Sequence, residues 1–133
     1  KKGENYGWKI LGWGGTNYSG TKIGPKWKPG FTKAIKYWTP SIGVSAIKFY
    51  LGEEFKEWNG KMLVASLRGM SLSIIDGLED ADPNEEMIFT NRINRIRDIE
   101  VDPNSGKIYL LGEKYFSENG PEDDGLWVLE KKK

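Results

Sequence analysis

The chain has 133 residues, enough for one domain or a part of one, and its 38% hydrophobic and 13% aromatic residues exclude wholesale disorder. Its 20 basic and 19 acidic residues nearly cancel, which argues against a global attraction to nucleic acid or to an anionic membrane. Cysteine and histidine are both absent, so disulfides, thiolate metal sites and histidine-dependent catalytic triads are excluded. Any acid–base chemistry must use carboxylates, lysine or a group supplied from elsewhere.

Residues 1–42 are predicted to be an ordered but irregular segment, rich in glycine and aromatic residues. Frequent glycines, with prolines at positions 25, 29 and 40, prevent a long helix because glycine costs conformational entropy and proline lacks an N–H donor. We expect large aromatic side chains to pin this segment: Tyr6, Trp8, Trp13, Tyr18 and Trp27.

Residues 43–133 are predicted to form short strands separated by turns, with no helix. The expected strands cover 44–51, 61–67, 71–76, 87–90, 95–101, 107–112 and 126–130. Residues 77–86 form an acidic loop in this interpretation, and the DPNSG sequence at 102–106 forms a tight turn. Pro103 presets φ in that turn, and Gly106 tolerates a positive φ before the next strand. The chain is therefore expected to be all-β.

Strands of this number and length make roughly two four-stranded antiparallel units, the size of β-propeller blades. A propeller needs at least about four blades to close. Three alternatives stay open: the chain is part of a longer polypeptide, copies of it complete one another, or the fold is a small sandwich. The sequence contains no segment apolar enough to span a membrane, and it starts without an initiator methionine or a signal peptide.

The strand at 95–101 carries two arginines close together. Strict alternation would place Ile93, Arg95, Arg97, Ile99 and Val101 on one face, and Asp98 and Glu100 on the other. Two guanidinium groups on one face repel each other unless an anion lies between them. From the residues alone, a solvated or ion-paired strand face is the favoured interpretation, and an anion-binding site is the alternative.

Four segments follow one another in an order that resembles a known family: GENYGW (3–8), WTPSIGVSAIKFY (38–50), FKEWNGKMLVASLRGMSL (55–72) and RIRDIEVDPNSGKIYLLGE (95–113). Together they resemble the C-terminal third of the soluble pyrroloquinoline quinone (PQQ)-dependent aldose sugar dehydrogenases, the glucose/sorbosone dehydrogenase family. The resemblance implies about two blades of a six-bladed β-propeller, with PQQ and calcium as cofactors. It also implies oxidation of the anomeric carbon of an aldose by hydride transfer to PQQ, an electron acceptor as partner, and a periplasmic or secreted location.

The resemblance also implies roles for individual residues. Arg68, Arg95 and Arg97 match the positions at which the family holds the cofactor, and Trp38 lies near the aromatic residues that line its sugar pocket. The family's general-base histidine has no counterpart here, and the calcium-binding segment would fall before residue 1. Lys9 also stands where the family usually has proline. The chain is thus expected to supply a cofactor-anchoring wall without the base, and not to oxidise sugar alone.

Other features of the sequence raise three alternative functions: calcium binding, nucleic-acid binding and association without a cofactor. The acidic clusters at 79–86 and 121–124 lack the spacing of a calcium-binding EF-hand loop, which favours solvated loops. The lysine-rich stretch 21–38 is the one candidate for nucleic-acid binding, and the neutral total charge argues against it. The main alternative to the dehydrogenase is a non-catalytic β module that binds no cofactor and associates through exposed blade edges.

Overall fold

The computed structural model describes residues 2–114 and 124–132. The chain divides into two compact units, Lys1–Ser41 and Ile42–Lys133. The first unit consists of turns and loops, and its described residues contain one isolated β-bridge, between Thr16 and Lys22. Backbone hydrogen bonds hold it, including Gly12 N to the Pro25 carbonyl oxygen at 3.0 Å.

The prediction that five aromatic residues pin the first unit is wrong for most of them, because four of the five are exposed, among them Tyr6 at 39% and Trp27 at 37%. Trp8 is 87% exposed and Tyr18 is fully exposed. The packed aromatic pair is instead Trp13 and Tyr37, whose ring centroids lie 4.8 Å apart. The loops of this unit approach each other closely at Gly24, where a Cβ would lie 2.1 Å from the Ile10 carbonyl oxygen.

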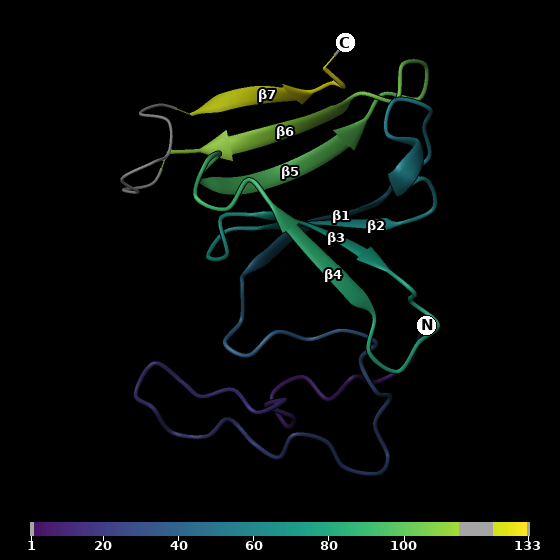
Figure 1. Ribbon diagram of the computed structural model, residues 1–133. Helices are drawn as coiled ribbons and strands as arrows, with labels where there is room; N and C mark the ends of the chain where they lie inside the picture. Colours follow the sequence, from purple (N-terminus) through teal and green to yellow (C-terminus); the bar gives the residue numbers. More distant parts are fainter. Residues whose placement is uncertain (1, 115–123, 133) are drawn as a thin grey trace. The chain divides into compact units, whose positions relative to one another are not determined.

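The second unit is all-β, as predicted, and contains seven strands. The strands are β1 (Val44–Phe49), β2 (Met62–Ser66), β3 (Leu72–Asp76), β4 (Asn84–Ile88), β5 (Arg95–Val101), β6 (Ile108–Glu113) and β7 (Gly125–Leu129). They form two antiparallel sheets, ordered β1-β2-β3-β4 and β5-β6-β7 (Figure 1). The one regular helix among the described residues is a 3₁₀ turn, η1 (Lys56–Trp58), between β1 and β2.

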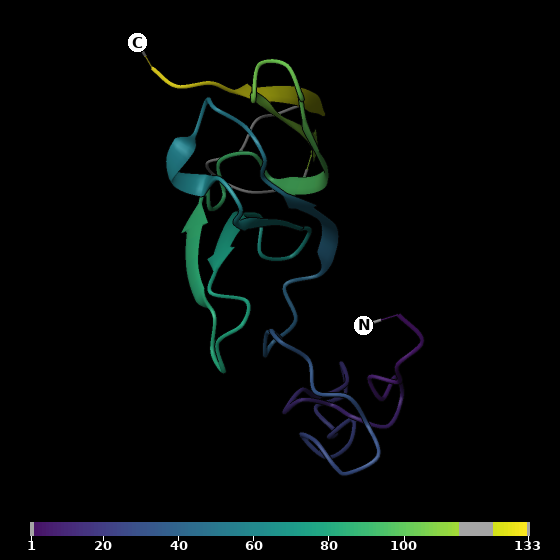
Figure 2. The ribbon, with the colours of Figure 1, turned by 90° about the vertical axis from the view of Figure 1, so that its right-hand side faces the viewer.

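The hydrophobic core lies between the two sheets. In Figures 1 and 2 the strands β5, β6 and β7 lie together on one side of the β1–β4 sheet, and β5 packs against β1 and β2. Two polar contacts join the sheets at this junction: Ser45 Oγ donates to the Ile96 carbonyl oxygen at 2.5 Å, and Lys48 Nζ lies 2.7 Å from Glu100 Oε2. The buried core side chains include Leu63, Leu72, Ile74, Ile96, Ile99, Ile108 and Leu110.

The fourth strand differs from its prediction. It was expected at 87–90, after an acidic loop, but it runs over Asn84–Ile88. Glutamates are tolerated there because β4 is an edge strand, and Ser73 Oγ donates to Glu85 Oε1 at 2.7 Å. Phe89 then ends the strand by taking a left-handed φ of 56°.

The predicted DPNSG turn is confirmed. Gly106 N donates to the Asp102 carbonyl oxygen at 2.8 Å, and Gly106 has a φ of 73°. This turn joins β5 to β6 and sets where their pairing starts, at Val101 and Ile108.

Candidate functional site

The β5 strand contains a β-bulge at its arginines. The pairing with β6 shifts between Ile96 and Asp98, which leaves Arg97 without a paired residue. Ile96 and Ile99, three residues apart, are consequently both buried in the core, at 0% and 1% exposure.

The bulge corrects the prediction of strict alternation along this strand. Arg95, Asp98 and Glu100 pair with Glu113, Leu111 and Tyr109, which share one face of β6. Arg95 therefore lies on the same outer face as the two acids, and not on the face of Ile99.

Arg95 and Arg97 converge on one carboxylate oxygen. Arg95 Nε lies 3.6 Å from Glu113 Oε2, and Arg97 Nη2 lies 2.5 Å from the same atom. Glu113 Oε2 is buried and makes no hydrogen bond among the described residues, so the attraction there is mainly between charges. The Arg95 side chain is 30% exposed and the Arg97 side chain 46%. The strand thus aims two permanent cations at one anion.

Sequence reasoning missed Glu113. A regular hairpin that starts with Val101 opposite Ile108 would place Lys114 opposite Arg95. The single extra residue of the bulge moves the register by one, so that Glu113 takes that position. The three-residue spacing of isoleucines 93, 96 and 99 was the available sequence signal, because it does not fit the period of two of a regular strand.

Arg68 lies at the same end of the second unit, in the turn between β2 and β3. Its backbone N–H donates to the Ile42 carbonyl oxygen at 2.8 Å, and its side chain is exposed. The pairing of Val44 with Ser66, and the bond from Ser45 to Ile96, bring this turn and the start of β5 to one end of the two sheets. Trp38 is half-buried and belongs to the first unit.

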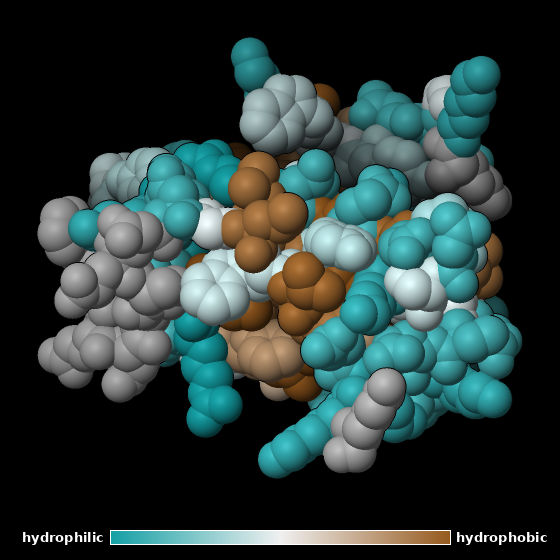
Figure 3. Space-filling view, turned by 90° about the horizontal axis from the view of Figure 1, so that it is seen from above, coloured by the Kyte–Doolittle hydropathy of each residue, from teal (hydrophilic) through white to brown (hydrophobic). Residues whose placement is uncertain are grey.

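A second feature is a groove of about 420 Å³ beside β7. Its apolar lining comes from Phe55, Trp58, Phe89, Ile93, Trp127 and Leu129. Phe55 and Trp58 stack with centroids 4.5 Å apart. In Figure 3, which views the molecule from the β7 side of Figure 1, hydrophobic side chains gather at the centre of the face within a hydrophilic surround. None of the predicted site residues lines this groove.

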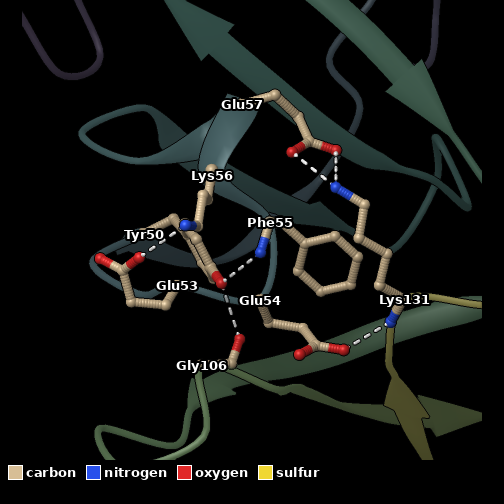
Figure 4. Close-up of polar contacts among 8 residues, drawn as sticks. All are labelled: Tyr50, Glu53, Glu54, Phe55, Lys56, Glu57, Gly106 and Lys131. Atoms are coloured by element: carbon tan, nitrogen blue, oxygen red, sulfur yellow. Dashed lines mark hydrogen bonds and ion pairs between the residues drawn. The ribbon is translucent and has the colours of Figure 1, made fainter. Parts of the chain in front are cut away.

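A third feature is a polar cluster around the β1–β2 connection (Figure 4). The Tyr50 hydroxyl donates to the Gly106 carbonyl oxygen at 2.8 Å and accepts from Phe55 N at 3.0 Å. Lys131 donates its backbone N–H to Glu54 Oε1 at 2.7 Å, and its Nζ pairs with Glu57 at 3.3 Å. Backbone N–H donation, helped by Lys131, lowers the pKa of Glu57. These carboxylates are engaged in holding loops together, which is a structural role.

Over residues 2–114 and 124–132, no group of three or more acidic side chains is placed to hold a metal ion. The acidic cluster 79–86 forms a loop and the start of β4, while 121–123 of the second cluster lie outside the described residues. In the same residues, no helix has the length and apolar character needed to cross a bilayer.

The chain is similar to proteins of one known family. The pattern of the family Glucose / Sorbosone dehydrogenase matches residues 1–120. The chain is 34% identical over 122 residues to the aldose sugar dehydrogenase YliI of Escherichia coli K12, covering 89% of this chain and 32% of that protein.

Two solved structures are also similar. A crystal structure of a glucose dehydrogenase has a TM-score of 0.78 at 30% identity, covering 98% of this chain and 36% of that one. The apo crystal structure of the soluble aldose sugar dehydrogenase of Escherichia coli has a TM-score of 0.75 at 29% identity, with the same coverage of 98% and 36%. The chain therefore spans about a third of the length of these relatives.

Proposed function

The chain belongs to the glucose/sorbosone dehydrogenase family, and its sheets form part of a β-propeller; from this premise we propose that it is the cofactor-anchoring part of a PQQ-dependent sugar dehydrogenase. The complete protein would oxidise the anomeric carbon of an aldose and pass the electrons to an acceptor. The base would come from outside this chain, which has no histidine. A periplasmic or secreted location is part of the same proposal.

One observation carries the proposal: Arg95 and Arg97 both reach a single carboxylate oxygen, that of Glu113. PQQ is a tricarboxylate, and guanidinium groups stay charged and bind carboxylates through paired N–H donors. A pair of arginines already arranged around one carboxylate fits such a ligand. When bound, PQQ would supply the quinone that accepts a hydride.

The roles proposed for the residues follow from their surroundings. Arg95 is held on the sheet face by its position opposite Glu113, so we assign it to orienting a bound carboxylate. Arg97, at the bulge and more exposed, is assigned to capturing one. Arg68, exposed on the neighbouring turn, would add a third positive charge, and Trp38 would contact the sugar substrate. For calcium, the described residues offer no cluster of acids, so no role is assigned to the ion here.

The alternative function is a non-catalytic β module without a cofactor. Exposed apolar side chains on sheet edges and faces, among them Ile47, Phe49 and Leu126, favour this alternative because they are typical of surfaces that associate. Cofactor binding discriminates between the two functions.

The experiment is a calorimetric titration of the 133-residue chain with PQQ, which measures the affinity of the chain for PQQ. We expect saturable binding, weakened roughly tenfold or more in Arg97→Ala, because a hydrogen bond to a charged group contributes about 1.5–3 kcal/mol. Arg92→Ala is the matched control, since it removes the same charge from an exposed position just before β5. We expect its affinity to stay within about twofold of the original.

Three outcomes would count against the proposal. Absence of saturable binding would favour the non-catalytic module. Equal losses in Arg97→Ala and Arg92→Ala would reduce the effect to general charge. Sugar oxidation by this chain with only PQQ and calcium added would show that the base lies within these residues after all.

A further inference from the structure

The charges of the chain are separated between its two units. Residues 1–41 carry eight lysines, one glutamate and no arginine, whereas residues 42–133 carry 12 basic and 18 acidic residues. The nearly neutral total is therefore the sum of a basic unit and an acidic unit. Exposed charges act over about 8 Å at physiological ionic strength, so a ligand at the first unit meets the local positive charge and not the total.

The first unit contains a hollow of about 400 Å³ beside the β-bridge between Thr16 and Lys22. A single stretch of the chain, residues 14–26, supplies its whole lining: three glycines, a proline, Thr16, Lys22 and Lys26. The hollow is thus formed within one loop, and its polar side chains are two cations and one hydroxyl.

The bridge places Thr16 and Lys22 side by side. Its two hydrogen bonds are donated by Asn17 N and Ile23 N, at 2.8 and 3.4 Å, so Thr16 and Lys22 form the non-hydrogen-bonded type of antiparallel pair. The two side chains of such a pair share a face and lie close together. Within the described residues, no hydrogen bond or ion pair engages the Thr16 hydroxyl or the Lys22 ammonium.

Lys26 brings a second ammonium group to the lining. Its Nζ lies 5.3 Å from the centroid of the Tyr37 ring, a cation–π contact that restrains the ammonium without neutralising its charge. In the part of the chain that the structure describes, no carboxylate pairs with Lys22 or Lys26, whereas Lys48 and Lys107 of the second unit are ion-paired at 2.7 Å. Both ammonium groups of the hollow are therefore available to an anion.

We propose that this hollow binds the phosphate group of a small phosphomonoester. Lysine is a compact point charge that suits a phosphate dianion, whereas planar carboxylates favour the fork of arginine, which the first unit lacks. The Thr16 hydroxyl can donate a hydrogen bond to a phosphate oxygen. The volume leaves room for an organic part, since sites of about 300–1,000 Å³ hold small molecules. This inference does not depend on the proposed enzymatic function.

The test is a titration of the whole chain with glucose 6-phosphate, observed through the amide resonances in nuclear magnetic resonance spectra. We expect saturable shifts centred on residues 14–16 and 22–26, reached at lower concentration than with inorganic phosphate and absent from these residues with glucose. Shifts centred on residues 92–97 would place the anion at the arginines of β5 and overturn the proposal. So would shifts that do not saturate, equal affinity for inorganic phosphate, or equal binding of glucose in the hollow.

Substitution of the lysines separates the site from general charge. Lys22→Gln and Lys26→Gln should each weaken the binding of glucose 6-phosphate roughly tenfold, because each removes a hydrogen bond between charged groups. The matched control is Lys28→Gln, which removes the same charge from the same unit outside the lining and should bind within about twofold of the original. Circular dichroism and the amide spectrum of each variant are compared with those of the original, so that a rearranged loop is not mistaken for lost binding. Equal losses in all three variants, or unchanged affinity in Lys22→Gln and Lys26→Gln, would overturn the proposal.

Discussion

Tyr50 joins two loops of the second unit. Its side chain is completely buried, and its hydroxyl connects the loop before η1 with the β5–β6 turn through Phe55 N and the Gly106 carbonyl oxygen (Figure 4). A buried N–H or carbonyl group that loses its partner costs about 1–3 kcal/mol. Two groups depend on this one hydroxyl.

The Tyr50→Phe variant should therefore lose roughly 2 kcal/mol or more of unfolding free energy. Urea denaturation measures the loss, with the midpoint falling and the slope unchanged. Tyr18→Phe is the control, because Tyr18 is fully exposed and the loss of its hydroxyl should change the stability little. A change below about 0.5 kcal/mol in Tyr50→Phe would contradict the role assigned to the hydroxyl.

Glu113 supplies the second prediction at this scale. Its carboxylate lies between Arg95 and Arg97 and competes with any other anion for them. Glu113→Gln removes the competing charge while it keeps the side chain's shape. The affinity of the chain for PQQ should then rise by roughly three- to tenfold, because a like charge next to an anion site opposes binding.

The calorimetric titration measures this effect, with Glu53→Gln, an exposed glutamate before η1, as control. Weaker binding in Glu113→Gln would show that Glu113 acts by orienting the arginines and not as a competitor. Strict alternation along β5 could not predict the carboxylate that Arg95 and Arg97 share, because that pairing depends on a β-bulge.

Individual elements were predictable to different degrees. The apolar strands β2 and β3 and the DPNSG turn lie where their patterns indicate, because buried side chains and turn residues leave few alternatives. The predicted bounds of β4 were wrong because exposed glutamates are typical of loops and of edge strands alike. In the first unit, glycine-rich turns gave no periodicity from which aromatic packing could be inferred.

The junction of β1 and β5 makes stability dependent on pH. Hydrogen bonding from Lys48 lowers the pKa of Glu100 below its ordinary value of 4.5. A carboxyl whose pKa is lower in the folded state stabilises the fold at pH values above 4.5, and this contribution disappears as the pH falls through the folded-state pKa. Glu100→Gln should therefore melt at a lower temperature than the original at neutral pH.

Thermal melts at low ionic strength, from neutral pH down to pH 3, measure this difference, which should shrink as the pH falls below about 4.5. The control is Glu79→Gln, in the exposed loop before β4. A difference for Glu100→Gln that stays constant over this range would mean that the charge of Glu100 does not hold the two sheets together.

At the scale of the molecule, the two units differ in what stabilises them. Every residue of the hydrophobic core cluster belongs to residues 42–133. In the described part of the first unit, Leu11 is the one buried hydrophobic residue, and turns supply the remaining order. Hydrophobic burial is the main source of folding free energy, so stability should reside almost wholly in the second unit.

A fragment of residues 42–133 should therefore fold alone and unfold in one cooperative transition. Its melting temperature should lie within about 5 °C of that of the whole chain, since a shift of that size corresponds to roughly 1 kcal/mol in a domain of this length. Tyr50→Phe should lower the stability of the fragment as much as that of the whole chain, because both groups that its hydroxyl satisfies lie within the fragment. A fragment without a cooperative transition would show that residues 1–41 contribute to the core of the second unit, and the separation of the chain into two independently stabilised units would be wrong.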